Sequence, residues 1–153
     1  MATTAGAALF HAATSTAVLL LAFGLFNGHL QWTTVFVPIV FLPLIVLAMG
    51  CGWFLASIGV FVRDVAQVVG MVMAVLMFLS PVFFPLSALP ARLRPWVLLN
   101  PMTFIIEQMR EVVIWGHPPN WAGLGTYFAI AVAVAWLGYA WFQRTRMGFA
   151  DVL

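Results

Sequence analysis

Four long apolar windows, at about residues 7–26, 34–62, 65–86 and 124–142, dominate the chain. Each contains about 20 residues or more, the length of helix that crosses a bilayer core of about 30 Å. Of the 153 residues, 65% are apolar and 7% are charged, whereas a soluble domain is roughly half apolar and a quarter charged. The surplus of apolar side chains has to face lipid. We therefore predict an all-α integral membrane protein, with residues 1–153 forming a single membrane domain of about four transmembrane helices and a short re-entrant or interfacial helical segment before the last span.

The few charged residues exclude some functions. The net charge of +2 comes from six arginines against four acidic residues, with no lysine. No basic run interleaved with aromatic residues is present to follow a phosphate backbone, so we expect no nucleic-acid partner. The single cysteine, Cys51, cannot form an intrachain disulfide, and its position between two glycines suggests a small packing residue. Because the first basic side chain is Arg63, the N-terminus lacks the charged region of a cleaved signal peptide.

The second window ends with features that predict a helix contact and a turn. Ala48, Gly52 and Ala56 stand at i, i+4 and i+8, a small-residue stripe that would let another helix backbone approach closely. Arg63 and Asp64 are the charged pair between two long apolar stretches. We therefore expect helix packing at the stripe and a tight cytoplasmic turn at Arg63 and Asp64.

The composition changes between residues 89 and 121, where charged residues, prolines and glycines are concentrated. Asn100 is suited to cap the N-terminus of a helix, Pro101 to occupy its first position, and Gly116 to end it. A helix of about 15 residues rises only about 22 Å, which is too short to cross a bilayer. Backbone that turns within a membrane persists only where protein or a watery cavity satisfies it. We therefore predict a re-entrant or interfacial segment at 89–121, where function is concentrated.

Glu107 and Arg110 in this helix stand at i, i+3 and allow two interpretations. As a solvated ion pair on a helix surface they would contribute a few tenths of a kcal/mol. At membrane depth each charge would cost at least about 2.5–3.5 kcal/mol, so a polar pathway or partner would have to be present. The sequence leaves both interpretations open.

The charge distribution predicts the orientation. Arg144 and Arg146 follow the last window, and basic residues favour the cytoplasmic side. With the Arg63 turn on the same side, Arg92 and Arg94 lie outside. Four spans then place both the N-terminus and the C-terminus in the cytoplasm.

Motifs for chemistry are scarce. The chain contains no HExxH, no Walker A glycine loop and no cluster of Cys and His ligands. His11, His29 and His117 stand in different segments. We therefore expect no metal site.

Several short motifs carry a resemblance to a known family. They are, in order, Gly59-Val60-Phe61-Val62-Arg63-Asp64-Val65, Leu79-Ser80-Pro81-Val82-Phe83-Phe84-Pro85, Leu99-Asn100-Pro101-Met102-Thr103 with Glu107 and Arg110, and the closing Phe149-Ala150-Asp151. In this combination and at these spacings the chain resembles, over nearly its whole length, the permeases of ABC exporters for O-antigen, capsule and teichoic-acid polymers.

The resemblance implies a permease subunit that is not an enzyme and holds no cofactor, with ATP and Mg bound on a separate ABC ATPase subunit. It also implies a second permease copy as a homodimer partner, a glycan or lipid-linked cargo, and a multi-pass location in the bacterial inner membrane. The 89–121 segment would form gate helices, with Asn100, Pro101, Glu107 and Arg110 at the transport path or gate. Permeases that this chain resembles look longer at the N-terminus and include a cytoplasmic coupling helix. We therefore expect a fragment, a truncated product or a split subunit.

Three alternatives to this interpretation stay open. The chain could be an ABC permease for a small hydrophobic drug or lipid, because related membrane domains share the number of helices. It could be a membrane enzyme subunit that uses Glu107 and His117 on a lipid-linked sugar, although no second carboxylate or metal set accompanies them. It could also be a non-functional truncated permease.

Overall fold

The computed structural model describes residues 2–27, 31–62, 64–82 and 86–146, and this part of the chain contains helices and turns but no strand. In chain order the elements are α1 (Ala2–Asn27), the 3-10 turn η1 (Trp32–Phe36), α2 (Val37–Phe61), α3 (Val65–Phe78), the 3-10 turn η2 (Leu86–Ala88), α4 (Arg94–Leu98), α5 (Pro101–Arg110), the π-helical turn η3 (Glu111–Trp115) and α6 (Trp121–Thr145). The all-α prediction is confirmed for these residues.

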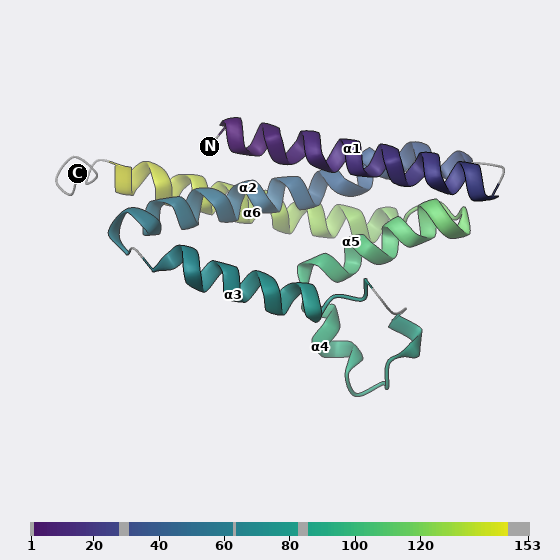
Figure 1. Cartoon of the computed structure of the whole chain (residues 1–153). Coiled ribbons are helices and arrows are strands. Elements are labelled where there is room, and N and C mark those ends of the chain that lie inside the picture. The colour runs from purple at the N-terminus through teal and green to yellow at the C-terminus, as the bar shows by residue number, and fades with distance from the viewer. Residues whose placement is uncertain (1, 28–30, 63, 83–85, 147–153) are drawn as a thin grey trace.

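Figure 1 shows the arrangement of the helices. α2 and α6 lie side by side and run in the same direction, whereas α3 diverges from them. The start of α1, the turn between α2 and α3 and the end of α6 lie at one end of the molecule, which we call the terminal end. α5 runs from the end of α3 toward the opposite end, where α6 begins. The helices therefore form a bundle that is held together at the end opposite the terminal end, whereas α3 lies apart from α2 and α6.

Two helical stretches are long and apolar enough to cross a membrane, Trp32–Phe61 and Trp121–Thr145. Shorter apolar stretches lie in α1 and α3, at Phe10–Leu25 and Val65–Phe78. The third predicted window extends to residue 86, but α3 ends at Phe78, because Pro81 lacks a backbone N–H and disfavours helical backbone at the preceding residue. With 14 residues α3 rises about 21 Å.

α2 and α6 pack along a seam of buried residues spaced seven apart. They include Pro43, Gly50 and Ser57 on α2 and Leu124, Ala131 and Gly138 on α6. A seven-residue repeat keeps one face of each helix toward its partner. At the tightest point a Cβ added at Gly138 would collide with the carbonyl of Gly50, and a Cβ added at Gly50 would lie 2.5 Å from the Cα of Ala135. The seam therefore requires glycine at both positions.

The predicted stripe does not form this contact. A Cβ added at Gly52 would meet nothing within 4 Å in the described chain, and Ala48 is exposed. Gly50 stands two residues from both, about 200° away around the helix, so the seam uses nearly the opposite face of α2. Cys51 is likewise exposed, and the packing role expected for it belongs to its neighbour Gly50. Contact of the stripe with another chain stays a prediction.

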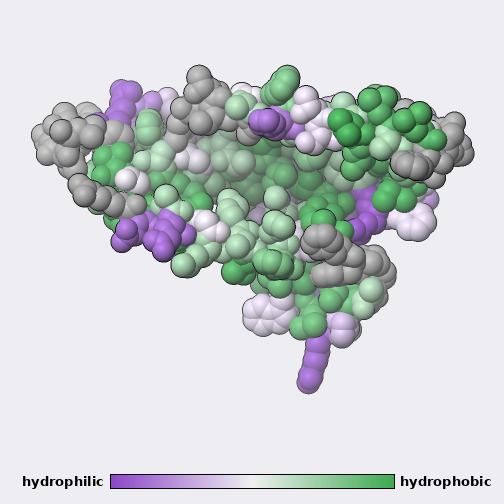
Figure 2. All heavy atoms as spheres, in the orientation of Figure 1, coloured by the Kyte–Doolittle hydropathy of each residue, from purple (hydrophilic) through white to green (hydrophobic). Residues whose placement is uncertain are grey.

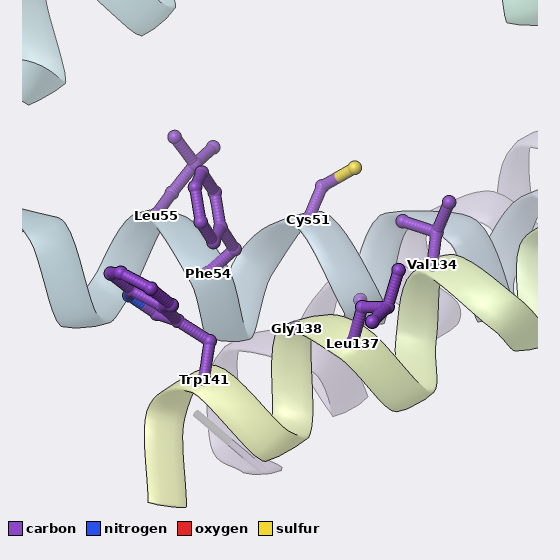
Figure 3. A pocket seen from close by; sticks show the side chains of 8 residues that line it. Cys51, Phe54, Leu55, Val134, Leu137, Gly138 and Trp141 are labelled. Atoms are coloured by element: carbon purple, nitrogen blue, oxygen red, sulfur yellow. The ribbon is translucent and has the colours of Figure 1, made fainter. Parts of the chain in front are cut away.

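Figure 3 shows the surface beside the glycine contact. Cys51, Phe54 and Leu55 of α2 and Leu137 and Trp141 of α6 surround a shallow groove of about 440 Å³, next to Gly138. The groove forms because the two glycines bring the helix axes together, leaving the large side chains to stand on either side. Its lining is apolar.

The outer surface is also apolar. Figure 2 shows hydrophobic residues over most of the visible face, with hydrophilic residues in small separate groups. Large apolar side chains such as Leu25, Phe78 and Trp136 are 84%, 78% and 68% exposed. α3 buries none of its residues within the chain. Soluble monomers rarely leave continuous apolar surface of this kind in water, so lipid or protein must cover it.

The seam leads to a matched pair of substitutions. Gly138→Ala should lower the free energy of unfolding by about 1–3 kcal/mol, because the added methyl overpacks the contact with Gly50. Gly52→Ala should leave it unchanged or raise it by up to about 1 kcal/mol, because the site is open and alanine favours helix. Thermal unfolding of purified protein in detergent, followed by tryptophan fluorescence, measures both effects. Equal effects at the two positions would contradict the assigned seam.

Candidate functional site

The predicted short helix in the 89–121 segment is present and is capped at both ends. Asn100 is the N-cap, with its side-chain oxygen accepting a hydrogen bond from the Met102 backbone N–H at 2.9 Å, and Pro101 occupies the first turn. The helical run ends at Gly116, whose φ of 68° is left-handed and suits glycine. These features confirm the predicted start and end of the helix. The π-helical turn η3, at Glu111–Trp115, was not predicted.

The apolar side of α5 and η3 packs into the hydrophobic core. The core is formed by six buried residues, Val37, Val40, Ile105, Val112, Val113 and Leu124. They come from the first turns of α2 and α6 and from α5 and η3. The Thr33 hydroxyl adds a hydrogen bond of 2.6 Å to the Val112 carbonyl. The α5–η3 segment therefore lies against the ends of the two long apolar helices.

The polar side chains of α5 bind backbone groups of its neighbours. Thr103, which is fully buried, donates to the Val97 carbonyl of α4 at 2.6 Å. Gln108 accepts from the Asn120 backbone N–H at 2.7 Å, just before α6. Tyr127 of α6 donates to the Pro101 carbonyl at 2.9 Å. Buried polar groups need such partners, and here they connect α5 to α4 and α6.

Glu107 and Arg110 form the predicted i, i+3 ion pair, with Arg110 Nη1 2.6 Å from Glu107 Oε1. Their side chains are only 28% and 19% exposed. Arg110 also donates through Nη2 to the Pro81 carbonyl at 2.9 Å. The pair therefore differs from a freely solvated pair, because half-burial and a third partner fix its geometry.

Arg110 also lines a groove of about 660 Å³ between α1 and the α5–η3 segment. The other lining residues are Ser15, Val18, Leu19, Ala22 and Phe23 of α1 and Ile106, Met109, Val113 and Ile114 of the α5–η3 segment. Arg110 is thus the one charged residue among the described residues that line this largely apolar groove. Such a groove suits a ligand that is mostly apolar.

The structure brings together some of the predicted site residues and separates others. Asn100, Pro101, Glu107 and Arg110 share one helix, and Arg110 joins them to the Ser80-Pro81 motif. Asp64 is exposed at the start of α3, at the terminal end, and Arg63 lies outside the described residues. Asp64, the described residue of the turn that we predicted to be cytoplasmic, is thus distant from α5.

His117 does not approach Glu107 as the enzyme alternative would need. Its Nδ1 lies 2.8 Å from Glu111 Oε2 instead. His11 is exposed on α1, and His29 lies outside the described residues. Within the described ranges, no three His, Cys, Asp or Glu side chains form a group that could hold a metal.

Sequence reasoning missed the partners of the site. Gln108 stands among the charged residues Glu107, Arg110 and Glu111, so nothing in the sequence marks it as the buried, bonded member of the group. The Leu76 and Pro81 carbonyls, which accept from Asn100 and Arg110, carry no signal either, because every residue has a carbonyl and only the fold selects which one is free.

Comparison with known proteins places these features in a family. The ABC-2 type transporter family model matches residues 1–114. The chain is 26% identical over 136 residues to the O-antigen export system permease protein RfbA of Myxococcus xanthus, covering 87% of this chain and 52% of that protein. It is 27% identical over 103 residues to the polysialic acid transport protein KpsM of Escherichia coli, covering 67% of this chain and 40% of that protein. The chain thus spans about half the length of these relatives, or less.

The family model covers about three quarters of the chain, and the resemblance inferred from the short motifs is confirmed at the level of the family. The chain belongs to the ABC-2 type transporter family.

Proposed function

We propose that the chain forms all or part of the membrane domain of the permease of an ATP-driven ABC exporter, and that its cargo is a polysaccharide or lipid-linked glycan crossing the bacterial inner membrane. The observation that carries this proposal is the capped helix α5, which packs against the first turns of α2 and α6 and carries the half-buried Glu107–Arg110 pair. The relatives named for O-antigen export and polysialic acid transport support the class of cargo.

The partners follow from what the chain lacks and from its family. The sequence contains no Walker A loop that could bind ATP. We propose that a separate ABC ATPase subunit binds ATP and Mg and drives the permease. A second copy of the permease would complete the conduit as a homodimer.

The proposed membrane arrangement has four crossings, by α1, α2, α3 and α6. α3, at about 21 Å, falls short of the roughly 30 Å core. The chain would therefore turn near the outer surface after α3, and α5 would dip into the outer half beside α2 and α6. Residues of α5 at that depth would lie next to the cargo, because protein or a watery path has to satisfy their charges.

The terminal end should face the cytoplasm, because α6 ends with Arg144 there and basic residues favour that side. In a Cys51→Ala background, a cysteine at Asp64 should react with a membrane-impermeant maleimide only from the cytoplasmic side of sealed vesicles. A cysteine at Arg92 should react only from the outer side. Reaction of position 64 from the outside alone would overturn the topology.

The Glu107–Arg110 pair can be tested with single and double substitutions in a complete, ATPase-coupled permease. Glu107→Gln and Arg110→Gln should each reduce export at least about tenfold while the protein still inserts, because an unpaired charge at membrane depth costs about 2.5–3.5 kcal/mol. The double variant should also fail if both side chains face the cargo. Export is measured as polymer reaching the outer side, per permease inserted.

The control and the contrary result are specific. Glu111→Gln should export normally, because that carboxylate is exposed and pairs with His117. Recovery of export in the double variant would mean that the two side chains only neutralise each other's charge and do not act on the cargo. Normal export by both single variants would contradict the proposal that Glu107 and Arg110 lie at the transport path or gate.

A further inference from the structure

We infer that Asn100 is a positioning residue that fixes the start of α5 to the C-terminal end of α3, so that the outer segment follows α3 when α3 moves. The transport consequence rests on the proposed function, whereas the contact itself does not. Asn100 is 2% exposed, so in this structure it contacts protein rather than cargo.

The side chain of Asn100 uses both of its polar atoms. Its oxygen caps α5 by accepting from the Met102 N–H at 2.9 Å. Its Nδ2 donates to the Leu76 carbonyl of α3 at 2.7 Å, across 24 positions of sequence. The side-chain amide of Asn100 thus satisfies a carbonyl in the last turn of α3 and caps the start of α5. An ionised aspartate could not do both, because its carboxylate supplies a capping acceptor but has no donor for the Leu76 carbonyl.

The Leu76 carbonyl needs a partner because of how α3 ends. The Leu79 N–H binds the Val75 carbonyl at 2.9 Å, and the Ser80 N–H binds the Met77 carbonyl at 3.2 Å. The Ser80 N–H would bind the Leu76 carbonyl in a continuing α-helix. The tightened last turn skips that carbonyl, and Asn100 replaces the missing donor. In a membrane this replacement is especially valuable, because lipid offers no hydrogen bond.

A second hydrogen bond, at the other end of α5, also attaches this helix to the end of α3. Arg110 donates to the Pro81 carbonyl at 2.9 Å, just beyond α3. Both ends of α5 are therefore attached to residues 76–81. α3 buries no residue of its own within the chain. These hydrogen bonds, together with the burial of Ser80 and Pro81 just after α3, locate the end of α3 against the outer segment.

The opposite side of α5 is attached to α6. Tyr127 donates to the Pro101 carbonyl at 2.9 Å, and the Asn120 N–H donates to Gln108 at 2.7 Å. α5 therefore connects a helix with little packing of its own to the tightly packed α2–α6 pair. A shift of α3 relative to that pair has to be transmitted through α5 or break the bonds of Asn100 and Arg110.

The substitution that isolates this contact is Asn100→Asp. Aspartate caps a helix as well as asparagine, so α5 keeps its N-cap, but the donor to Leu76 is lost. Asn120→Asp is the matched control, because Asn120 also caps a helix, accepting from the Gly123 N–H at 3.0 Å, and is exposed. The same substitution is thus made at a buried cap that contacts α3 and at an exposed cap that does not.

Hydrogen–deuterium exchange of this chain in lipid nanodiscs tests the contact without transport. In Asn100→Asp, exchange at residues 77–82 should rise at least tenfold while residues 104–110 exchange as before. Asn120→Asp should change neither segment. Unchanged exchange at 77–82 would overturn the inference, as would an equal rise in both segments, because the latter would mean that only the helix cap was lost.

Transport by a complete, ATPase-coupled permease tests the consequence. Asn100→Asp should keep ATP hydrolysis and lose at least tenfold in export, whereas Asn120→Asp should keep both. Normal export in Asn100→Asp would overturn the positioning role, even if exchange at 77–82 had risen. The proposed function is judged separately by the Glu107 and Arg110 variants. Their failure to affect export would leave the exchange result standing.

Discussion

The structure depends on the requirement that polar groups next to lipid find hydrogen-bond partners inside the protein. A chain in which 65% of the residues are apolar can place many side chains against lipid, but it has to supply partners for its backbone and for most of its few polar side chains. The polar residues of α5 show how the requirement is met. Asn100, Thr103 and Arg110 each donate to a main-chain carbonyl of a neighbouring segment.

The same requirement explains why the helices are held in place by different interactions. α2 and α6 pack by shape, with Gly50 and Gly138 allowing backbones to touch. α5 is held by hydrogen bonds to α4, α6 and the end of α3. The close-packed glycine seam resists displacement. α5 is packed into the core through Ile105 as well as bonded to its neighbours, which fixes its place beside α6.

Local features of the fold were predictable from the sequence, and pairings were not. Asn100, Pro101 and Gly116 marked α5 because capping depends on neighbouring residues alone. The small-residue stripe on α2 predicted packing against another helix, but the sequence did not indicate that α6 would contact Gly50 on the other face, because small residues occur on both faces and only the fold decides between them. Likewise, the Glu107–Arg110 pair followed from i, i+3 spacing, but its bond to the Pro81 carbonyl required the fold.

The central claim is that α5 lies against α6 within the membrane domain, and cross-linking tests it most directly. An added Cβ at Gly123 would lie 2.7 Å from the tip of the Phe104 ring. In intact membranes, cysteines at 104 and 123 in a Cys51→Ala background should be joined by a short bifunctional thiol reagent. Cysteines at 104 and 136 should not, because position 136 is about 20 Å further along α6. Failure of the 104–123 pair to cross-link, with both cysteines reactive, would place α5 away from α6 and contradict the account.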